Sequence, residues 1–250
     1  TPVSDHHDEM LFIIQHQTSE LWMKLVIHEL QSCLVSIQKD EIRPAFKVLA
    51  RVGHIQAELA QQWNVLATLT PPEYLQFRDK LGKASGFQSY QYRAIEFMLG
   101  NKNRAMLKPH VHTPEIHEWL TGFLEARSIY DEFFAFLKRR GHDIPDELLE
   151  RDFSEPHTPN DQALKVFKNI YENPHKYWTE YEMAEKLIDV EERFQLWRFK
   201  HLSTVKRIIG RRMGTGGSSG VGFLEKALRL CFFPELWDVR SGLQAPKDNK

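Results

Sequence analysis

The sequence contains little cysteine, since Cys33 and Cys231 are the only two among 250 residues. Each lies in an apolar helical pattern with no second cysteine nearby, which argues against a disulfide framework or a cysteine metal site. Long apolar runs are missing too, because nothing approaches the roughly 18 uninterrupted apolar residues of a membrane span. We therefore expect a soluble protein of the reducing cytoplasm.

An excess of charge of one sign is also absent. The chain has 33 Lys and Arg residues against 34 Asp and Glu residues. Such a balance creates no field that would attract nucleic acid or an anionic membrane, and neither is expected as a partner. The length allows a substantial buried core, and we expect residues 1–250 to form one domain.

Alternation of apolar and polar residues with a period of two, the pattern of strands, is not found. Apolar residues recur at steps of three and four almost everywhere, which predicts an all-α fold built on two or three long helices. Thr70-Pro-Pro-Glu73 has the pattern of a capping box with proline at the first helical position. Proline, glycine and capping residues place the expected helices at about 5–40, 44–69, 71–82, 87–99, 114–127, 128–141, 175–209 and 223–233, with a short one after Asn160 and a looser excursion over 142–159.

Glycine is sparse except in one stretch, MGTGGSSGVG, where five of the thirteen glycines fall within residues 213–222. A Walker loop is excluded because Phe223 and Leu224 stand where the lysine and hydroxyl residue should follow. No Gly-x-Gly-x-x-Gly frame is present, and no strand precedes the stretch. A flexible connection between two helices is the commoner explanation. The alternative is a backbone that approaches a ligand closely, with Thr215 available for a contact.

Most of the twelve histidines stand in polar surroundings and are expected at the surface. The clearest examples are His110, His112, His117, His142, His157 and His175. Zinc binding by the first three is poorly supported, because Pro109 and Pro114 break the segment and no HExxH pattern occurs.

Two histidines differ from the rest. His201 continues an apolar helical stripe that includes Phe194 and Trp197, so its imidazole is predicted to be buried. A buried histidine is more often a hydrogen-bonded core residue than a ligand. His16 follows Phe12 by one turn at the edge of an apolar stretch, where a ligand pocket and a satisfied core histidine are equally good interpretations.

A third candidate is the segment PPEYLQFRDKLG, which places Tyr74, Arg78 and Leu81 on one face of a short helix. An arginine beside a tyrosine can present a bidentate fork to a carboxylate. The plainer interpretation is a surface arginine paired with an acid.

Four stretches together carry a family resemblance: HHDEMLFIIQHQTSELW, LTPPEYLQFRDKLGKASGFQSYQYRAIEFMLGNKN, FQLWRFKHLSTVKRIIG and GTGGSSGVGFL. They resemble tryptophan 2,3-dioxygenase, the haem enzyme that opens the indole ring of L-tryptophan with O2. The resemblance extends in order over nearly the whole chain.

The resemblance implies a role for each matching residue. His201 matches the axial ligand of the iron in haem b, an arrangement that leaves the opposite iron face open for O2. His16 matches the distal histidine that accepts a hydrogen bond from the indole N–H, and Arg78 the arginine that forks onto the substrate carboxylate. The residues implied around the haem are Trp63, Ser85, Gly86, Tyr92, Trp197 and Val205. Those implied at the substrate are Phe12, His16, Tyr74, Arg78 and Thr215, with His16 as the catalytic residue.

The implied reaction adds both atoms of O2 across the indole C2–C3 bond and gives N-formyl-L-kynurenine, the first step of tryptophan catabolism by the kynurenine pathway. The resemblance also implies a homotetramer, and an aromatic N-terminal segment that reaches the neighbouring subunit's pocket and that this sequence lacks. Residues 213–222 are expected to form a mobile lid over bound tryptophan. The alternatives are a haem-binding sensor or carrier without turnover, and a helical scaffold in which both histidines are structural.

Overall fold

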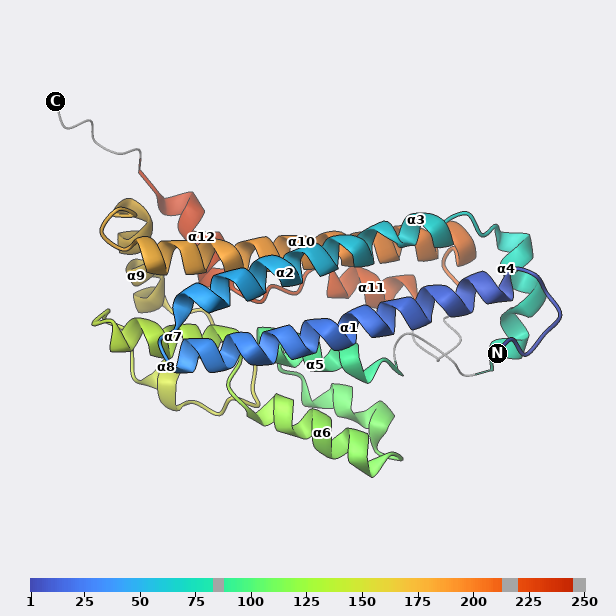
Figure 1. Ribbon diagram of the computed structural model, residues 1–250, viewed down its shortest axis with the longest axis horizontal. Helices are drawn as coiled ribbons and strands as arrows, with labels where there is room; N and C mark the ends of the chain where they lie inside the picture. The colour runs from blue at the N-terminus through green and yellow to red at the C-terminus, as the bar shows by residue number, and fades with distance from the viewer. Residues whose placement is uncertain (83–87, 213–219, 245–250) are drawn as a thin grey trace.

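The computed structural model describes residues 1–82, 88–212 and 220–244, and within these ranges all regular structure is helical. The all-α prediction is therefore confirmed. Figure 1 shows the long helices lying side by side, with shorter helices at both ends and below them.

The three long segments are α1 (Glu9–Gln38), α2 (Ile42–Gln61), which the short α3 (Trp63–Leu66) continues, and α10 (Trp178–Ile209). α2 packs against both α1 and α10. A short turn joins α1 to α2, so the two helices run in opposite directions, and α10 runs in the direction of α2 (Figure 1). The start of α1, the whole of α3 and the end of α10 consequently meet at one end of the molecule.

The apolar stripe predicted on the long helix faces the core. Leu187, Val190, Phe194 and Trp197 of α10 are all buried. Burying a large apolar side chain completely contributes roughly 1.5–3 kcal/mol, so the stripe is a main source of the free energy that holds α10 against its neighbours. The stripe leads directly to His201, one turn beyond Trp197.

The predicted capping box is present at the start of α4 (Pro71–Arg78). The backbone N–H of Thr70 donates to Glu73 Oε2 at 2.7 Å, and Pro71 occupies the first helical position. A 3-10 turn, η1 (Asp79–Leu81), follows and ends at Gly82, whose φ of +60° suits glycine. Local sequence therefore fixes where α4 begins and ends, and with it the position of Arg78.

The remaining helices agree in part with the prediction. As expected, the structure contains α5 (Tyr90–Leu99), α6 (Pro114–Glu125), α7 (Ile129–Arg139) and α9 (Asp161–Glu172). It also has the 3-10 helix η3 (Arg104–His110) and the single turn α8 (Glu147–Glu150), which were not predicted. The last helix, expected over 223–233, lies earlier as α11 (Val221–Ala227), and a further helix, α12 (Pro234–Gly242), follows it. Proline suits the first turn of a helix, so Pro234 marks a start that the prediction missed.

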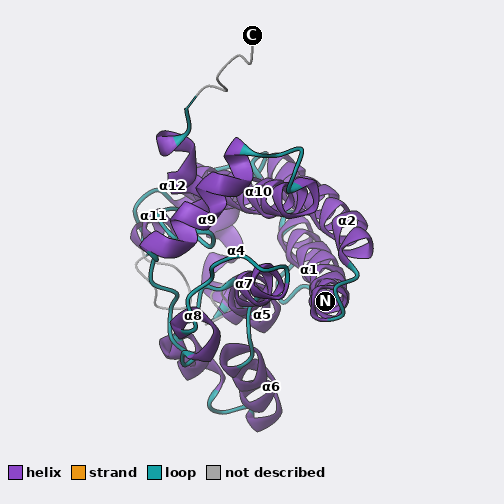
Figure 2. Ribbon diagram, turned by 90° about the vertical axis from the view of Figure 1, so that its left-hand side faces the viewer, coloured by secondary structure: helices purple, strands orange, loops and turns teal. Residues whose placement is uncertain are grey.

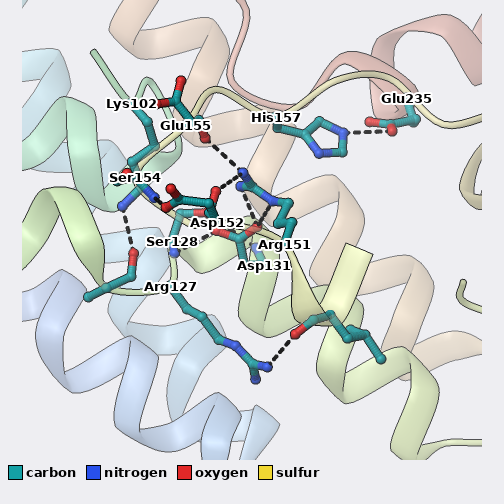
Figure 3. A network of polar contacts seen from close by, with 12 residues as sticks. Lys102, Arg127, Ser128, Asp131, Arg151, Asp152, Ser154, Glu155, His157 and Glu235 are labelled. Atoms are coloured by element: carbon teal, nitrogen blue, oxygen red, sulfur yellow. Dashed lines mark hydrogen bonds and ion pairs between the residues drawn. The ribbon is translucent and has the colours of Figure 1, made fainter. Parts of the chain in front are cut away.

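The stretch between α7 and α9 is held by a polar network (Figure 3). Arg151 pairs with Asp131 at 2.7 Å, and Asp131 also accepts the Ser128 hydroxyl at 2.6 Å. Nearby, the wholly buried Lys102 donates to the carbonyl oxygens of Phe123 and Ala126, each at 2.7 Å. The Arg151 pair fastens the stretch between α7 and α9 to α7, and the Lys102 bonds join the link between α5 and η3 to the end of α6.

The expectation that His110, His142 and His157 lie at the surface is wrong. His110 is buried, and the side chains of His142 and His157 are each only 7 % exposed. His157 donates from Nε2 to the buried carboxylate of Glu235 on α12 at 2.7 Å, which offsets part of the cost of burying the ring (Figure 3). Partners more than 70 residues away in the chain are invisible to a local pattern.

The end-on view in Figure 2 shows α6 on the outside of the molecule, below α5 and α7. Within the described ranges, no helix is both long and apolar enough to cross a membrane.

Candidate active site

His201 lies in the last third of α10 between two tryptophan rings. The ring of Trp63, at the start of α3, stacks on the imidazole with 4.5 Å between centroids and 10° between planes. Trp197, one turn earlier on α10, lies 5.7 Å from the imidazole. Both tryptophans are buried, and Val205, one turn further along α10, is half-buried. The two indoles fix the orientation of the His201 ring.

The His201 imidazole is neutral at physiological pH. Burial lowers its pKa to about 3, and repulsion by a charge on His16 adds to the effect. The ring is half-buried by exposed area, so the prediction of full burial is only partly correct. Among the described residues it has ring contacts but no hydrogen-bond partner, which is unlike a satisfied core histidine. A neutral imidazole without a partner is a competent metal ligand.

His16 lies on α1 across from His201, close enough for the two charges to interact. Its Nδ1 is 2.7 Å from the carbonyl oxygen of Phe12, one turn earlier. Because a carbonyl oxygen can only accept, Nδ1 must carry the proton of the neutral ring. Burial lowers the pKa of His16, against the opposing effects of this hydrogen bond and of Glu20, so the neutral form dominates at pH 7. Nε2 therefore carries a lone pair and can accept a hydrogen bond.

Aromatic contacts join α1 to α4 beside His16. The Phe12 ring lies 4.3 Å from the His16 ring, 5.8 Å from Tyr74 and 5.9 Å from Phe77. Tyr74 and Phe77 are both buried and meet edge to face at 5.4 Å. Each such pair adds about 0.5–1.5 kcal/mol beyond the buried area, so α4 is firmly placed against the start of α1.

Arg78 is brought to the same place by α4. The residue is half-buried and lies one turn after Tyr74. Burial raises the pKa of Tyr74, while the charge of Arg78 and a hydrogen bond with its guanidinium act in the opposite direction. The sequence-based grouping of Phe12, His16, Tyr74 and Arg78 is therefore a real cluster in space.

Tyr92 belongs to the His201 side of the site. Its ring stacks on Phe194 at 5.7 Å and lies 5.4 Å from Trp197. Its hydroxyl accepts from Arg198 Nε at 3.1 Å, and burial raises the pKa of Tyr92 to about 12.

Sequence reasoning missed a buried ion-pair cluster behind Tyr92. Glu96 accepts from Arg198 at 2.8 Å and from Arg93 at 2.5 Å, and all three residues are buried. The available signal was Arg198 itself, a charge between Trp197 and Phe199. A buried charge requires a partner, and that requirement predicts an acid on a facing helix.

Three predicted residues, Ser85, Gly86 and Thr215, lie outside the described residues, as does most of the glycine-rich stretch 213–222. Their expected roles and the lid stay predictions.

The residues present fit a haem better than a metal ion held directly by the protein. Within the described ranges no group of three or more His, Cys, Asp or Glu side chains could hold a metal ion. A macrocycle that supplies four ligands needs only one imidazole from the protein. The indole N–H groups of Trp63 and Trp197, which flank His201, are buried without a partner among the described residues. Buried donors left unpaired are uncommon in folded proteins and are typical of a ligand site.

Comparison with known proteins decides the family. The family model described as tryptophan 2,3-dioxygenase matches residues 2–115 and 165–243. The chain belongs to the tryptophan 2,3-dioxygenase family. All the described site residues named above fall in the matched ranges, and the unmatched stretch 116–164 contributes none of them.

Relatives within the tryptophan 2,3-dioxygenase family extend the match over almost the entire chain. A protein of that name from Myxococcus xanthus is 58% identical over 241 residues, covering 96% of this chain and 83% of its own length. Those from Serratia proteamaculans and Kineococcus radiotolerans are 59% and 60% identical, covering 96% and 95% of this chain and 86% and 83% of their own lengths.

Proposed function

We propose that this protein is a haem-dependent dioxygenase that adds both atoms of O2 across the indole C2–C3 bond of L-tryptophan, giving N-formyl-L-kynurenine. The observation that carries the proposal is the pair of neutral histidines that face each other at one end of the helical body. Among the described residues His201 has no hydrogen-bond partner, and the Nε2 of His16 carries a lone pair because Nδ1 bonds to Phe12. Membership of the tryptophan 2,3-dioxygenase family identifies L-tryptophan as the substrate.

His201 would hold the iron of haem b, and the other residues that would contribute to the haem site are Trp63, Ser85, Gly86, Tyr92, Trp197 and Val205. The bound haem supplies a ferrous iron that binds and activates O2. The pKa of His201, about 3, keeps its imidazole unprotonated over the whole physiological range. The Trp63 ring stacks on the His201 imidazole and restricts rotation about the side-chain bonds of His201.

His16 orients the indole. Its Nδ1–H donates to Phe12, so Nε2 accepts the N–H of the substrate ring. A neutral imidazole is too weak a base to remove the proton of an indole N–H, so the hydrogen bond positions the ring without transferring the proton. Phe12 packs beside His16 and gives the apolar face of the indole a matching surface.

Arg78 would bind the carboxylate end of the substrate. Its guanidinium can donate two parallel hydrogen bonds to the carboxylate, and Tyr74 holds the guanidinium in place. Thr215 would bind the ammonium or the carboxylate and close the glycine-rich lid. Contacts at both ends of the amino acid fix the indole over the reacting oxygen, a positioning effect worth several kcal/mol.

The proposal includes a homotetramer of single-domain subunits. Apolar side chains exposed along the outer face of α1 support it, because large exposed apolar surfaces are typical of protein interfaces. These side chains are Met10, Ile14, Leu21 and Val35.

A product assay on purified, haem-loaded protein tests the activity. We expect O2 consumption and N-formyl-L-kynurenine formation in equal amounts, with no external reductant consumed, because the reaction needs no net electrons. The variant His201→Ala should fold, lose most of its haem and make no product, while His175→Ala, which changes an exposed histidine, should behave as the parent. A haem-loaded parent that makes no product would favour a sensor or carrier instead.

A further inference from the structure

Next to the candidate site, a side-chain hydrogen bond joins α1 to the residue between α2 and α3. α2 ends at Gln61 and α3 begins at Trp63, so Gln62 alone forms the junction. The Gln62 side chain reaches α1, where its Nε2–H donates to the Ser19 hydroxyl at 3.1 Å. The Ser19 hydroxyl in turn donates to the carbonyl oxygen of Gln15 at 2.9 Å. Ser19 is buried, so water does not compete effectively for these bonds.

The two ends of this bond stand next to the two histidines. Ser19 lies three residues after His16, on the same helix. Gln62 immediately precedes Trp63, whose ring stacks on His201 at 4.5 Å. One serine hydroxyl therefore links the helix that bears His16 to the tryptophan that orients His201.

The spacing of the two histidines matters because an imidazole nitrogen with an unused lone pair can bind iron. His201 has ring contacts but no hydrogen-bond partner among the described residues, and His16 uses only Nδ1 in its bond to Phe12, so Nε2 carries a lone pair. If α1 could approach α10, His16 would become a second axial ligand. The position where O2 and the substrate must enter would then be blocked.

We propose that Ser19 and Gln62 are positioning residues that hold His16 too far from the iron on His201 to coordinate it. This inference rests on the proposed function. The bond fixes the distance between α1 and α3, and the Trp63 stack transmits that constraint to His201.

Where the Gln62–Ser19 bond joins α1 to the α2–α3 junction, two more buried side-chain atoms are a hydrogen-bond donor and a hydrogen-bond acceptor. Gln15 Nε2, a donor, and Gln62 Oε1, an acceptor, are both buried without partners among the described residues. Both belong to residues that already bond to Ser19. A donor and an acceptor at one crossing are the pair that a bridging water would join, which would strengthen the same link.

The optical and EPR spectra of the haem-loaded ferric protein test the proposal. Ser19→Ala removes the hydroxyl, and Gln62→Met keeps the length of the side chain while removing its amide. Each variant should shift the population toward low-spin, bis-histidine iron by about fivefold, the factor that one ordinary hydrogen bond supplies. The double variant should shift it no further than a single one, because both changes delete the same bond.

Thr18→Ala is the matched control. Its hydroxyl donates to the carbonyl oxygen of Ile14 at 2.7 Å, in the way Ser19 donates to Gln15, but it faces the exterior. The control should keep the spectrum of the parent. As a second check, adding His16→Ala to Ser19→Ala should abolish the low-spin signal.

The experiment distinguishes failure of the proposed function from failure of this inference alone. A parent that takes up no haem overturns both the proposed function and this inference. A parent that binds haem while Ser19→Ala and Gln62→Met keep its spectrum overturns the inference alone and leaves the proposed function intact. Low-spin iron that persists after His16→Ala also contradicts the inference, because the second ligand would then be another group.

Discussion

A single backbone carbonyl, that of Phe12, determines what His16 can do. It accepts the Nδ1 proton, and burial keeps a second proton off the ring. His16 is therefore an acceptor at Nε2, which is the role an indole N–H requires. The role depends on the helix as much as on the histidine, since a residue one turn earlier supplies the carbonyl.

Activity should consequently fall at acid pH through protonation of His16. The folded-state pKa of His16 is below its ordinary value of 6.5, so the acceptor form is complete above that pH and is lost only as the pH falls through the lowered pKa. The acid limb of kcat/KM against pH should thus have a midpoint below 6.5, and His16→Ala should remove the limb along with most of the activity. A midpoint at or above 6.5 would show that the buried, neutral histidine is not the controlling group.

Arg78 should contribute mainly to substrate binding. Arg78→Ala removes the fork for the carboxylate and should raise the KM for tryptophan, at a cost of roughly 2–5 kcal/mol in transition-state binding if the pair is shielded from water. Lys80→Ala deletes an exposed cation two residues further on and is the control. Steady-state kinetics that give Arg78→Ala the KM of the parent would refute its role.

At the scale of the helices, α2 and α10 pack against each other, and Gly53 of α2 lies in that contact beside the side chain of Arg193. A Cβ added there would lie 3.2 Å from Cδ of Arg193 on α10, closer than nearly all real contacts of that kind. Glycine at this position lets the two helices pack tightly. Because α3 continues α2, the packing of α2 on α10 also positions Trp63 against His201.

Gly53→Val should destabilise the protein by about 1–3 kcal/mol, because the added methyl groups crowd the side chain of Arg193 where α2 packs on α10. Gly122 offers the matched control: it is also helical, in α6, but a Cβ there meets nothing within 4 Å. Gly122→Val should leave stability unchanged or slightly improve it, since valine has the higher helix propensity. Urea unfolding measures both variants, and equal effects would contradict the role of Gly53.

Helix positions were predictable where local signals set them, and elsewhere they were not. The capping box at Thr70 and the stripe through Phe194 and Trp197 specify their elements by spacing alone. The helix starting at Pro234 was missed because an apolar run preceded the proline. Likewise, the partner of His157 is Glu235, and no local pattern reveals a bond across that separation.

At the scale of the whole molecule, the fold brings segments that are far apart in the sequence together at one end of the helical body. These segments form the candidate site. α1 supplies His16, α3 Trp63, α4 Arg78 and α10 His201, and Figure 1 shows these parts of the chain meeting near the N-terminus. The residues of the candidate site were predicted from the sequence through the family resemblance, and their roles stay predictions. Their mutual geometry, above all the parallel stack of Trp63 on His201, needed the structure.

The exposed apolar face of α1 should be an interface between subunits. Leu21 is 70% exposed, and Leu21→Asp would place a charge in that interface at a high desolvation cost. Light scattering should show a tetramer for the parent and smaller species for the variant. Lys47→Asp, at an exposed position on α2, is the control and should keep the mass of the parent. If Leu21→Asp retained the parent's tetrameric mass, this face of α1 would not be the interface.

The central claim is that one pocket holds both haem and tryptophan, and the absorption spectrum of the purified ferrous protein tests it most directly. The account predicts a Soret band that shifts when L-tryptophan is added, because the proposed substrate site adjoins the proposed haem site at His201. In Arg78→Ala the same shift should require a much higher concentration of tryptophan. A colourless protein, or a Soret band that tryptophan leaves unchanged, would contradict the account.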